Sequence, residues 1–265
     1  MTQEPRGPLP RGLRREVVSF ARRDGRVHPK IARAWRPRHE ELLVHPQRGE
    51  RDASLDPRWR FDPVMAFGRS APLVVEIGSG VGEVVLASAA AHPQWDHLAV
   101  EVYRPGAAKT VLRADRAGLC NVRVLQADAA ALLRTGLEPA SVAEIRIFFP
   151  DPWPKARHHK RRLITPATLR DAAQVLSPGG VLRLATDWAD YAASMLVAVE
   201  SVPMLCNPYQ GGPSGGYAPR WEGRPETHFE RKGARQGRTA FDIQAVRRRQ
   251  IAPSDPPESR ISLQE

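Results

Sequence analysis

The 265-residue sequence has only two cysteines and no long apolar run. Cys120 and Cys206 cannot build a disulfide framework, and they do not have the spacing of a zinc site. No apolar stretch approaches the roughly 18 residues that cross a bilayer. No apolar segment follows the basic N-terminus either, as one would in a signal peptide. We therefore expect a cytoplasmic protein with no membrane association and no bound metal.

Acidic residues are outnumbered in this sequence. There are 29 Asp and Glu against 40 Lys and Arg, which gives a formal net charge of +11. A basic surplus favours a polyanionic partner, because each phosphate that a cation neutralises releases a bound counterion. Nearly all of the basic residues are Arg, however, and a compositional bias would produce the same surplus. Charge alone leaves both explanations open.

The chain divides into three segments by composition. Residues 1–60 are rich in Arg and interrupted by Pro, which predicts a basic N-terminal extension that is partly disordered. Residues 61–246 alternate short apolar runs with helical patterns, which predicts the main domain. Residues 247–265 are expected to form a disordered C-terminal tail. The length suits one α/β core with such extensions.

Apolar runs and helical patterns alternate along the main domain. Strands are predicted at 73–77, 97–102, 122–126, 142–149, 181–185 and 239–246. Helices are predicted at 83–91, 107–117, 129–134, 166–176 and 188–200, with Thr165 as the N-cap of the fourth and Pro178-Gly179-Gly180 as its exit. The chain from 203 to 238 is expected to be a loop. This order implies a mostly parallel sheet covered by helices on both faces.

A glycine-rich turn follows the first predicted strand, in the sequence Glu76-Ile77-Gly78-Ser79-Gly80-Val81-Gly82. Such glycines allow a tight turn and the close approach of a ligand, although a plain strand-to-helix turn has the same appearance. The spacing is not the Gly-x-Gly-x-x-Gly of dinucleotide sites. A carboxylate at Glu76 would also repel a pyrophosphate but accept a hydrogen bond from an ammonium group. S-adenosylmethionine, which carries an ammonium group and no phosphate, therefore fits better than a dinucleotide.

Two more acids stand at the ends of successive predicted strands: Glu101 ends the second, and Asp128 follows the third. Glu101 stands where an acid meets ribose hydroxyls in nucleotide-binding folds, and Asp128 is positioned to receive an adenine amino group. Each has a plainer interpretation, because Glu101 can be a solvated strand end and Asp128 a helix N-cap. Together with Glu76, the three acids favour a cofactor site.

The segment Phe148-Phe149-Pro150-Asp151-Pro152-Trp153 follows the fourth predicted strand, at the edge where open α/β sheets bind their ligands. The two prolines predict an extended, stiff loop that presents Asp151. Trp153 is suited to stacking on a base or on a side chain. A rigid structural turn with a buried Trp153 is the alternative.

A basic run follows directly, from Lys155 to Arg162. Such runs are usually solvated faces or localisation signals. Beside a base pocket, the same run is suited to gripping phosphates of RNA. The adjacent histidines of the run lack further ligands, so they give poor support for a metal site.

With these motifs in place, residues 72–242 resemble the bacterial tRNA (guanine-N7-)-methyltransferase family of class I S-adenosylmethionine-dependent enzymes. The segment Phe148–Arg162 is similar to the family's signature, and Glu76-Ile77-Gly78 to its cofactor loop. Three further segments resemble family motifs: Glu101–Gly106, Ala185–Trp188 and Arg224–Glu230. The resemblance implies a Rossmann-like domain with a seven-stranded, mostly parallel sheet whose last strand is antiparallel.

The resemblance also implies roles for individual residues. It implies cofactor binding by Glu76, Gly78, Gly80, Glu101, Asp128 and Asp151, with Asp151 also catalytic. Substrate binding is implied for Lys155, Asp187, Thr227, His228, Phe229 and Glu230, where His228 replaces the family's usual Lys or Arg. RNA contact is implied for Arg157, His158, His159, Lys160, Arg161 and Arg162.

The expected reaction is methyl transfer from S-adenosylmethionine to guanine N7 in tRNA, at guanine 46 of the variable loop by resemblance. The N7 atom has an in-plane lone pair and no proton to lose, so alignment and charge stabilisation suffice. Asp151 and Asp187 are the candidates to receive the guanine edge. The alternatives are a methyltransferase acting on an exocyclic amino group of RNA, a non-catalytic RNA-binding protein and a nicotinamide dehydrogenase. We expect a monomer without an obligate protein partner.

Overall fold

The computed structural model describes residues 29, 31, 37–49 and 54–249. The strands are β1 (Leu43–Val44), β2 (Leu73–Ile77), β3 (Asp96–Val100), β4 (Val122–Leu125), β5 (Val142–Phe148), β6 (Leu176–Thr186), β7 (Leu205–Cys206) and β8 (Phe241–Arg247). The α-helices are α2 (Pro63–Phe67), α3 (Glu83–Ala91), α4 (Arg104–Arg116), α5 (Ala129–Ala131), α6 (Pro166–Val175), α7 (Ala189–Glu200) and α8 (His228–Ala234). Short turns of other helix types are η1 (Pro37–Leu42), η2 (Leu132–Gly136) and η3 (Ala156–Arg161). Most of the predicted extension and tail lies outside the described residues.

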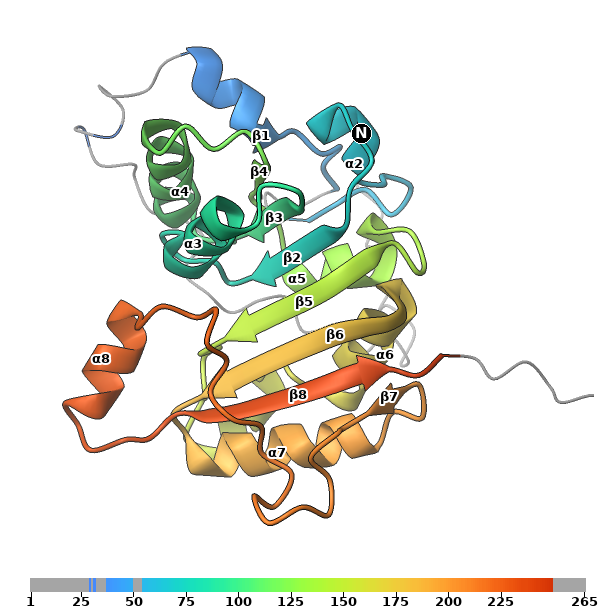
Figure 1. The fold of residues 1–265 in the computed structure, drawn as a ribbon, viewed down its shortest axis with the longest axis vertical. Coiled ribbons are helices and arrows are strands. Elements are labelled where there is room, and N and C mark those ends of the chain that lie inside the picture. Colours follow the sequence, from blue (N-terminus) through green and yellow to red (C-terminus); the bar gives the residue numbers. More distant parts are fainter. Residues whose placement is uncertain (1–28, 30, 32–36, 50–53, 250–265) are drawn as a thin grey trace, which may run out of the picture.

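The strands form one sheet in the order β1-β4-β3-β2-β5-β6-β8-β7. Neighbours are parallel except at β8, which runs antiparallel to both β6 and β7 (Figure 1). The predicted α/β class and antiparallel strand are confirmed, but the sheet has eight strands in place of seven. The two strands that were not located, β1 and β7, have two residues each, which is too short for a periodic pattern. β7 also makes β8 an inner strand, and β1 lies within the segment assigned to the N-terminal extension.

Two local predictions were wrong. Pro178 to Gly180 do not follow α6 as a loop, because β6 begins at Leu176, immediately after the helix, and contains them. A register shift between Val142 and Glu144 of β5 accommodates this start. The segment after 203 is also not loop throughout, since it contains α8. By contrast, α3 has the predicted bounds and Thr165 is the N-cap of α6.

Two apolar layers enclose the sheet. On one face, α6 and α7 pack on β2, β5 and β6 through residues such as Leu169 and Met195. On the other face, α3 and α4 cover only β3 and β4, through residues such as Val85 and Val111. Figure 1 shows the chain between β7 and α8 running in front of β6 and β8 on this second face. The β2–β5–β6–β8 half of that face therefore has no helix over it among the described residues.

Candidate functional site

A pocket of about 670 Å³ lies at the carboxyl ends of β2, β3, β4 and β5. Open α/β sheets bind ligands at this edge, and the volume is typical of a cofactor site. Ten residues with predicted roles line it: Glu76, Gly78, Gly80, Glu101, Asp128, Asp151, Arg161, Thr227, His228 and Phe229. Residues with predicted roles that do not line it are Lys155, Arg157, His158, His159, Lys160, Arg162, Asp187 and Glu230. All of the predicted cofactor residues therefore line the pocket, whereas only some of the predicted substrate residues do.

The glycine turn forms the floor of this pocket. Gly78, Gly80 and Gly82 all have positive φ angles, of 73°, 58° and 80°. Only glycine adopts such angles without strain, which explains the residue type at these positions. Gly106 of α4 packs directly on the turn, because a Cβ there would lie 2.7 Å from the Gly80 carbonyl oxygen. The turn is therefore held closely against α4.

Glu76 is the penultimate residue of the buried strand β2, and its carboxylate lacks a full set of partners. The residue is 3% exposed, and its Oε2 has no hydrogen-bond partner among the described residues. Burial raises the pKa of Glu76 to about 8, although the positive charge of Arg146 opposes the rise. A buried acceptor that lines a pocket without a donor is costly unless a ligand supplies one. An ammonium group is the donor that this oxygen fits.

Glu101 and Asp128 both line the pocket and both have structural contacts. Glu101 accepts hydrogen bonds from the backbone N–H groups of Gly80 and Tyr103, each at 2.8 Å, so it ties the glycine turn to the end of β3. Burial raises the pKa of Glu101 against these two bonds. Asp128 caps α5, with its Oδ1 accepting from the N–H groups of Ala130 and Ala131. The N-cap interpretation of Asp128 is therefore right, and it does not conflict with a place in the pocket.

The loop after β5 is shaped by two residues with left-handed backbones. Phe149 has φ 51° and Trp153 has φ 46°, on either side of the exposed Asp151. Such angles cost about 1–3 kcal/mol for a residue other than glycine, so the surroundings must enforce them. The Phe149 N–H donates to the Ala185 carbonyl at 2.8 Å, and the Arg161 guanidinium lies 4.9 Å from the Trp153 ring centroid. Asp151 is thus presented on a tightly held loop.

The basic run after this loop has an outer and an inner part. Lys155, Arg157 and Lys160 are exposed, and none has an ion-pair partner within the described part of the chain. Arg162 differs from its predicted role in RNA contact, because only 6% of the residue is exposed. It donates to the Pro152 carbonyl at 2.9 Å and pairs with Asp190 of α7. Arg162 therefore fastens the loop to α7.

His158 and His159 lie between these two parts. The His158 ring meets Trp153 edge-on, with 5.9 Å between centroids, and His159 Nε2 lies 3.1 Å from Arg162. Both histidines thus contact neighbouring side chains of the same loop. No group of three or more potential metal ligands occurs among the residues that the structure covers. Nor is any helix in that part of the chain long and apolar enough to cross a membrane.

The first turn of α8 forms the opposite rim of the pocket. The Thr227 hydroxyl accepts a hydrogen bond from the Glu230 N–H, and the Glu230 carboxylate accepts one from the Thr227 N–H. The two bonds together make a capping box. The Thr-x-x-Glu pattern at 227–230 is the sequence signal for such a helix start, although this segment is predicted above as a loop. The His228 N–H also donates to Glu83 of α3 at 3.2 Å. Thr227, His228 and Phe229 are thus fixed at the pocket.

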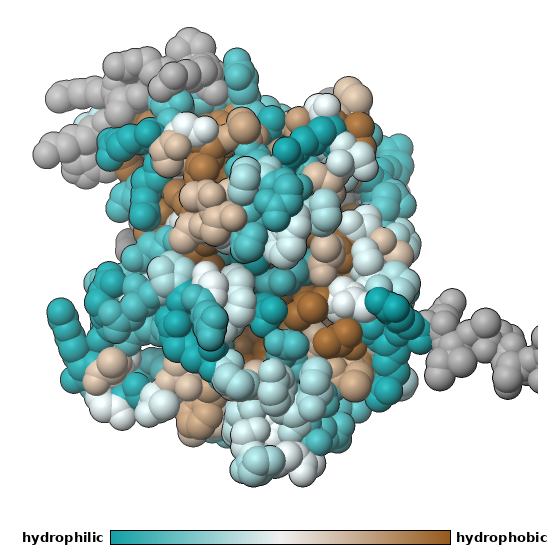
Figure 2. Space-filling view, in the orientation of Figure 1, coloured by the Kyte–Doolittle hydropathy of each residue, from teal (hydrophilic) through white to brown (hydrophobic). Residues whose placement is uncertain are grey.

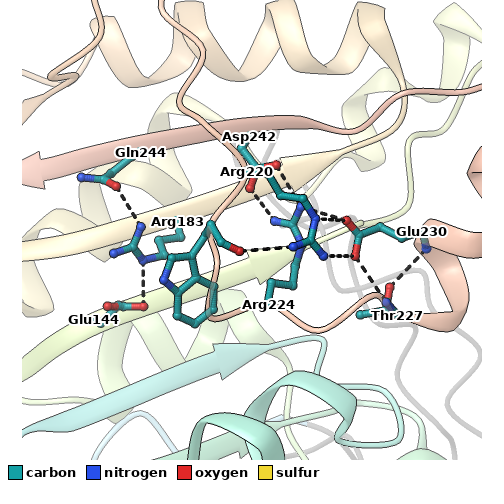
Figure 3. Close-up of polar contacts among 9 residues, drawn as sticks. Glu144, Arg183, Arg220, Arg224, Thr227, Glu230, Asp242 and Gln244 are labelled. Atoms are coloured by element: carbon teal, nitrogen blue, oxygen red, sulfur yellow. Dashed lines mark hydrogen bonds and ion pairs between the residues drawn. The ribbon is translucent and has the colours of Figure 1, made fainter. Parts of the chain in front are cut away.

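Two predicted substrate residues are occupied elsewhere. The Glu230 carboxylate is held by Arg220 and Arg224, at 3.1 and 3.0 Å (Figure 3). Burial would raise the pKa of Glu230, but these hydrogen bonds lower it below its usual value. Asp187 pairs with Arg238 at 2.7 Å. Glu230 therefore holds the start of α8, and Asp187 holds the chain that follows this helix. Neither residue lines the pocket.

Arg224 connects the α8 rim of the pocket to the end of β5, a role that the sequence patterns did not indicate. Its side chain is fully buried, donates to Asp242 of β8 at 2.9 Å and to Glu230 of α8 (Figure 3), and lies 5.0 Å from the Phe148 ring centroid. Cation–π contacts of this kind strengthen when they are shielded from water. Arg224 lies within a motif that resembles the family, but only the tertiary contacts reveal its function.

A row of polar residues crosses the half-sheet that lacks a helix. Register aligns Glu76 of β2 with Arg146, Arg183 and Gln244 on successive strands. Arg183 lies between Gln244 and Glu144, as Figure 3 shows. Arg146 also pairs with Glu144, and its guanidinium lies 4.2 Å from the Trp221 ring centroid. This register places a buried positive charge beside Glu76, which no local sequence pattern could show.

Several known proteins are similar to this chain. The family model "Putative methyltransferase" matches residues 70–243. The tRNA (guanine-N7-)-methyltransferase of Cutibacterium acnes is 46% identical over 231 residues, which cover 87% of this chain and 83% of that protein. The enzyme of the same name from Nocardioides sp. is 47% identical over 90% of both chains. Among solved structures, the 16S rRNA methyltransferase KamB has a TM-score of 0.49 and 18% identity, covering 68% of this chain and 90% of that one.

Proposed function

Because this chain belongs to the tRNA (guanine-N7-)-methyltransferase family, we propose that it transfers the methyl group of S-adenosylmethionine to N7 of a guanine in tRNA. The target is the variable-loop guanine, guanine 46. The observation that carries the proposal is similarity to enzymes of this name at 46–47% identity over about nine tenths of the chain. These names do not favour an amino-group methyltransferase or a non-catalytic RNA-binding protein.

The pocket residues fit the cofactor group by group. The unsatisfied Oε2 of Glu76 receives the ammonium group, and Glu101 at the end of β3 receives the ribose hydroxyls. Asp128, which also lines the pocket, receives the adenine amino group. When bound, the cofactor supplies an electrophilic methyl group on a sulfonium. The tight packing of Gly106 on Gly80 holds the turn in the shape that this binding needs.

The protein does not need to remove a proton from guanine in this reaction, because N7 carries none. The N7 lone pair forms a bond to the methyl carbon as the carbon–sulfur bond breaks, and the electron pair of that bond remains on sulfur as a thioether. The purine becomes cationic in the process. Asp151, exposed at the pocket, accepts hydrogen bonds from guanine N1–H and N2–H₂ and stabilises this charge. Asp187 is paired with Arg238, which leaves Asp151 as the candidate.

Outside the pocket, Lys155, Arg157 and Lys160 contact the RNA backbone from the exposed side of η3. Arg162 is excluded from this role by its burial. The enzyme acts in the cytoplasm as a monomer without an obligate protein partner. The proposed location follows from the substrate, because bacterial tRNA is found in the cytoplasm.

The test is methyl transfer from labelled S-adenosylmethionine to unmodified tRNA transcripts, with identification of the labelled nucleoside. We expect 7-methylguanosine, and we expect it to disappear when guanine 46 is replaced. Label on adenine or on guanine N2 would contradict the N7 assignment. Tight binding of cofactor and tRNA without transfer would instead indicate a non-catalytic RNA-binding protein.

A further inference from the structure

Helix α8 carries its basic residues on one face. His228, Arg231, Lys232 and Arg235 follow the spacing i, i+3, i+4 and i+7, which places side chains on the same side of a helix. Arg235, the C-cap, has helical backbone angles, so the face continues to it. Gly233 lies on another side, where a Cβ would come within 2.6 Å of Asp187. The outer residues of this face, Lys232 and Arg235, therefore lie on a different side of the helix from the one that packs against Asp187.

Two cations of this face are available for a partner. Arg231 is engaged, because it pairs with Glu83 at 3.7 Å and donates to the Glu226 carbonyl at 2.7 Å. Lys232 and Arg235 are exposed, and neither has an ion-pair partner among the residues that the structure describes. Exposed basic residues next to a ligand pocket are suited to an anionic ligand.

The helix is too short to hold its position alone, and a buried network does so. Arg224 and Arg220 both bind Glu230 of the first turn, and Arg224 also binds Asp242 of the inner strand β8 (Figure 3). Ion pairs from Glu230 and the capping box therefore anchor the helix start to the sheet. Cations on an anchored helix lose less conformational freedom on binding than cations on a free loop.

The position of α8 relates this face to the pocket. The helix lies beyond the carboxyl ends of β2, β5 and β6 (Figure 1), and its first residues line the pocket. Figure 2 shows hydrophilic surface over α8. At 1.5 Å per residue, the basic face extends about 10 Å outward from His228 to Arg235. The basic run at η3 is also next to the pocket, because Asp151 and Trp153 before it and Arg161 at its end line the pocket.

We propose that Lys232 and Arg235, on the exposed face of α8, form a second phosphate-binding surface for the RNA substrate, separate from the η3 run. The RNA backbone is then bound at both η3 and α8, on two sides of the pocket. Two points of contact limit how far the RNA segment that presents the guanine can rotate. The inference rests on the proposed function for the identity of the polyanion. The competing explanation is that cations near a helix C-terminus merely stabilise the helix dipole.

The test is the salt dependence of tRNA affinity for the double variant Lys232→Gln/Arg235→Gln. Each lost phosphate contact reduces the slope of log Kd against log salt by about 0.7–0.9, so we expect a reduction of about 1.4–1.8. The matched control is Arg116→Gln/Arg170→Gln, which removes two exposed cations from α4 and α6 outside the pocket. We expect a smaller change in the control, and S-adenosylmethionine affinity should be unchanged in both variants.

A slope that is unchanged, or changed equally in the control, would overturn the proposal and leave only the helix-dipole explanation. The single variant Arg235→Gln should give about half of the double-variant effect, since one contact is lost. Turnover of the wild-type protein on tRNA separates this question from the proposed function. A wild type that binds tRNA but forms no 7-methylguanosine would refute the function, while the slope comparison would still test the α8 surface.

Discussion

The buried carboxyl group of Glu76 should release a proton when S-adenosylmethionine binds. Burial raises its pKa to about 8, with the Arg146 charge opposing the rise and the Glu144 charge adding to it. At pH 7, one unit below this pKa, about 0.9 of the free protein carries the proton. The cofactor's ammonium group needs the ionised carboxylate, so binding should release about 0.9 proton. Affinity should then rise by about tenfold per pH unit between pH 6 and 7.

Titration calorimetry measures this release directly. The binding enthalpy at pH 7 is determined in two buffers of different ionisation enthalpy, such as phosphate and Tris, and the slope between them is the number of protons exchanged. The control is Glu76→Gln, which keeps the shape of the side chain and removes its titration. It should show no release from this site. Its affinity should fall by roughly 10- to 100-fold, as expected for the loss of a hydrogen bond to a charged group, worth about 1.5–3 kcal/mol.

Two results would refute the reasoning. If the wild-type enthalpy does not depend on the buffer, Glu76 is already ionised in the free protein and the Arg146 charge outweighs burial. If Glu76→Gln releases as many protons as the wild type, the titrating group is another one. Glu101 is then the candidate, because burial raises its pKa as well.

Three further predictions concern the pocket and its support. Asp151→Asn should lower kcat by roughly 10²- to 10³-fold, the usual cost of losing one charge-stabilising group, and full turnover in the methyl-transfer assay would show that Asp151 has no such role. Gly106→Ala should weaken S-adenosylmethionine binding in a direct titration, because its Cβ would lie 2.7 Å from the Gly80 carbonyl; unchanged affinity would mean that the turn tolerates the displacement. Arg162→Met should destabilise the fold by roughly 1–3 kcal/mol in urea unfolding, because the buried guanidinium loses its hydrogen bonds to the Pro152 carbonyl and to Ser194. The salt slope of tRNA binding should not change in this variant, and a reduced slope with intact stability would return Arg162 to the RNA surface.

The local sequence was sufficient to predict most elements of the fold. The glycine turn, the N-cap at Thr165 and the alternation of apolar runs with helical patterns depend on interactions between residues close in the chain. The same is true of the cofactor pocket, because parallel strands bring their carboxyl ends to one edge of the sheet. Glu76 lies at the carboxyl end of such a strand, and Glu101 and Asp128 follow two others, so their convergence could be predicted without coordinates.

The side chains near the pocket could not be assigned in the same way. Arg162 stands in an unbroken basic run, yet it turns inward to Asp190, which is 28 residues away in the chain. Glu230 matches a substrate motif, but Arg220 and Arg224 hold it. A sequence pattern shows which charges are available, whereas burial and distant partners decide which of them remain free.

By itself, then, the sequence determined the α/β class, the cofactor edge and the chemistry of its acids, because these follow from local periodicity and strand direction. Only the tertiary structure decided that Arg146 lies beside Glu76, that Arg224 joins the α8 rim to the end of β5 and that α8 presents a basic face. These arrangements depend on strand register and on contacts between β5, β8 and α8. Long-range pairings of this kind leave no periodic signal, because each partner's position is set by the packing of the whole sheet.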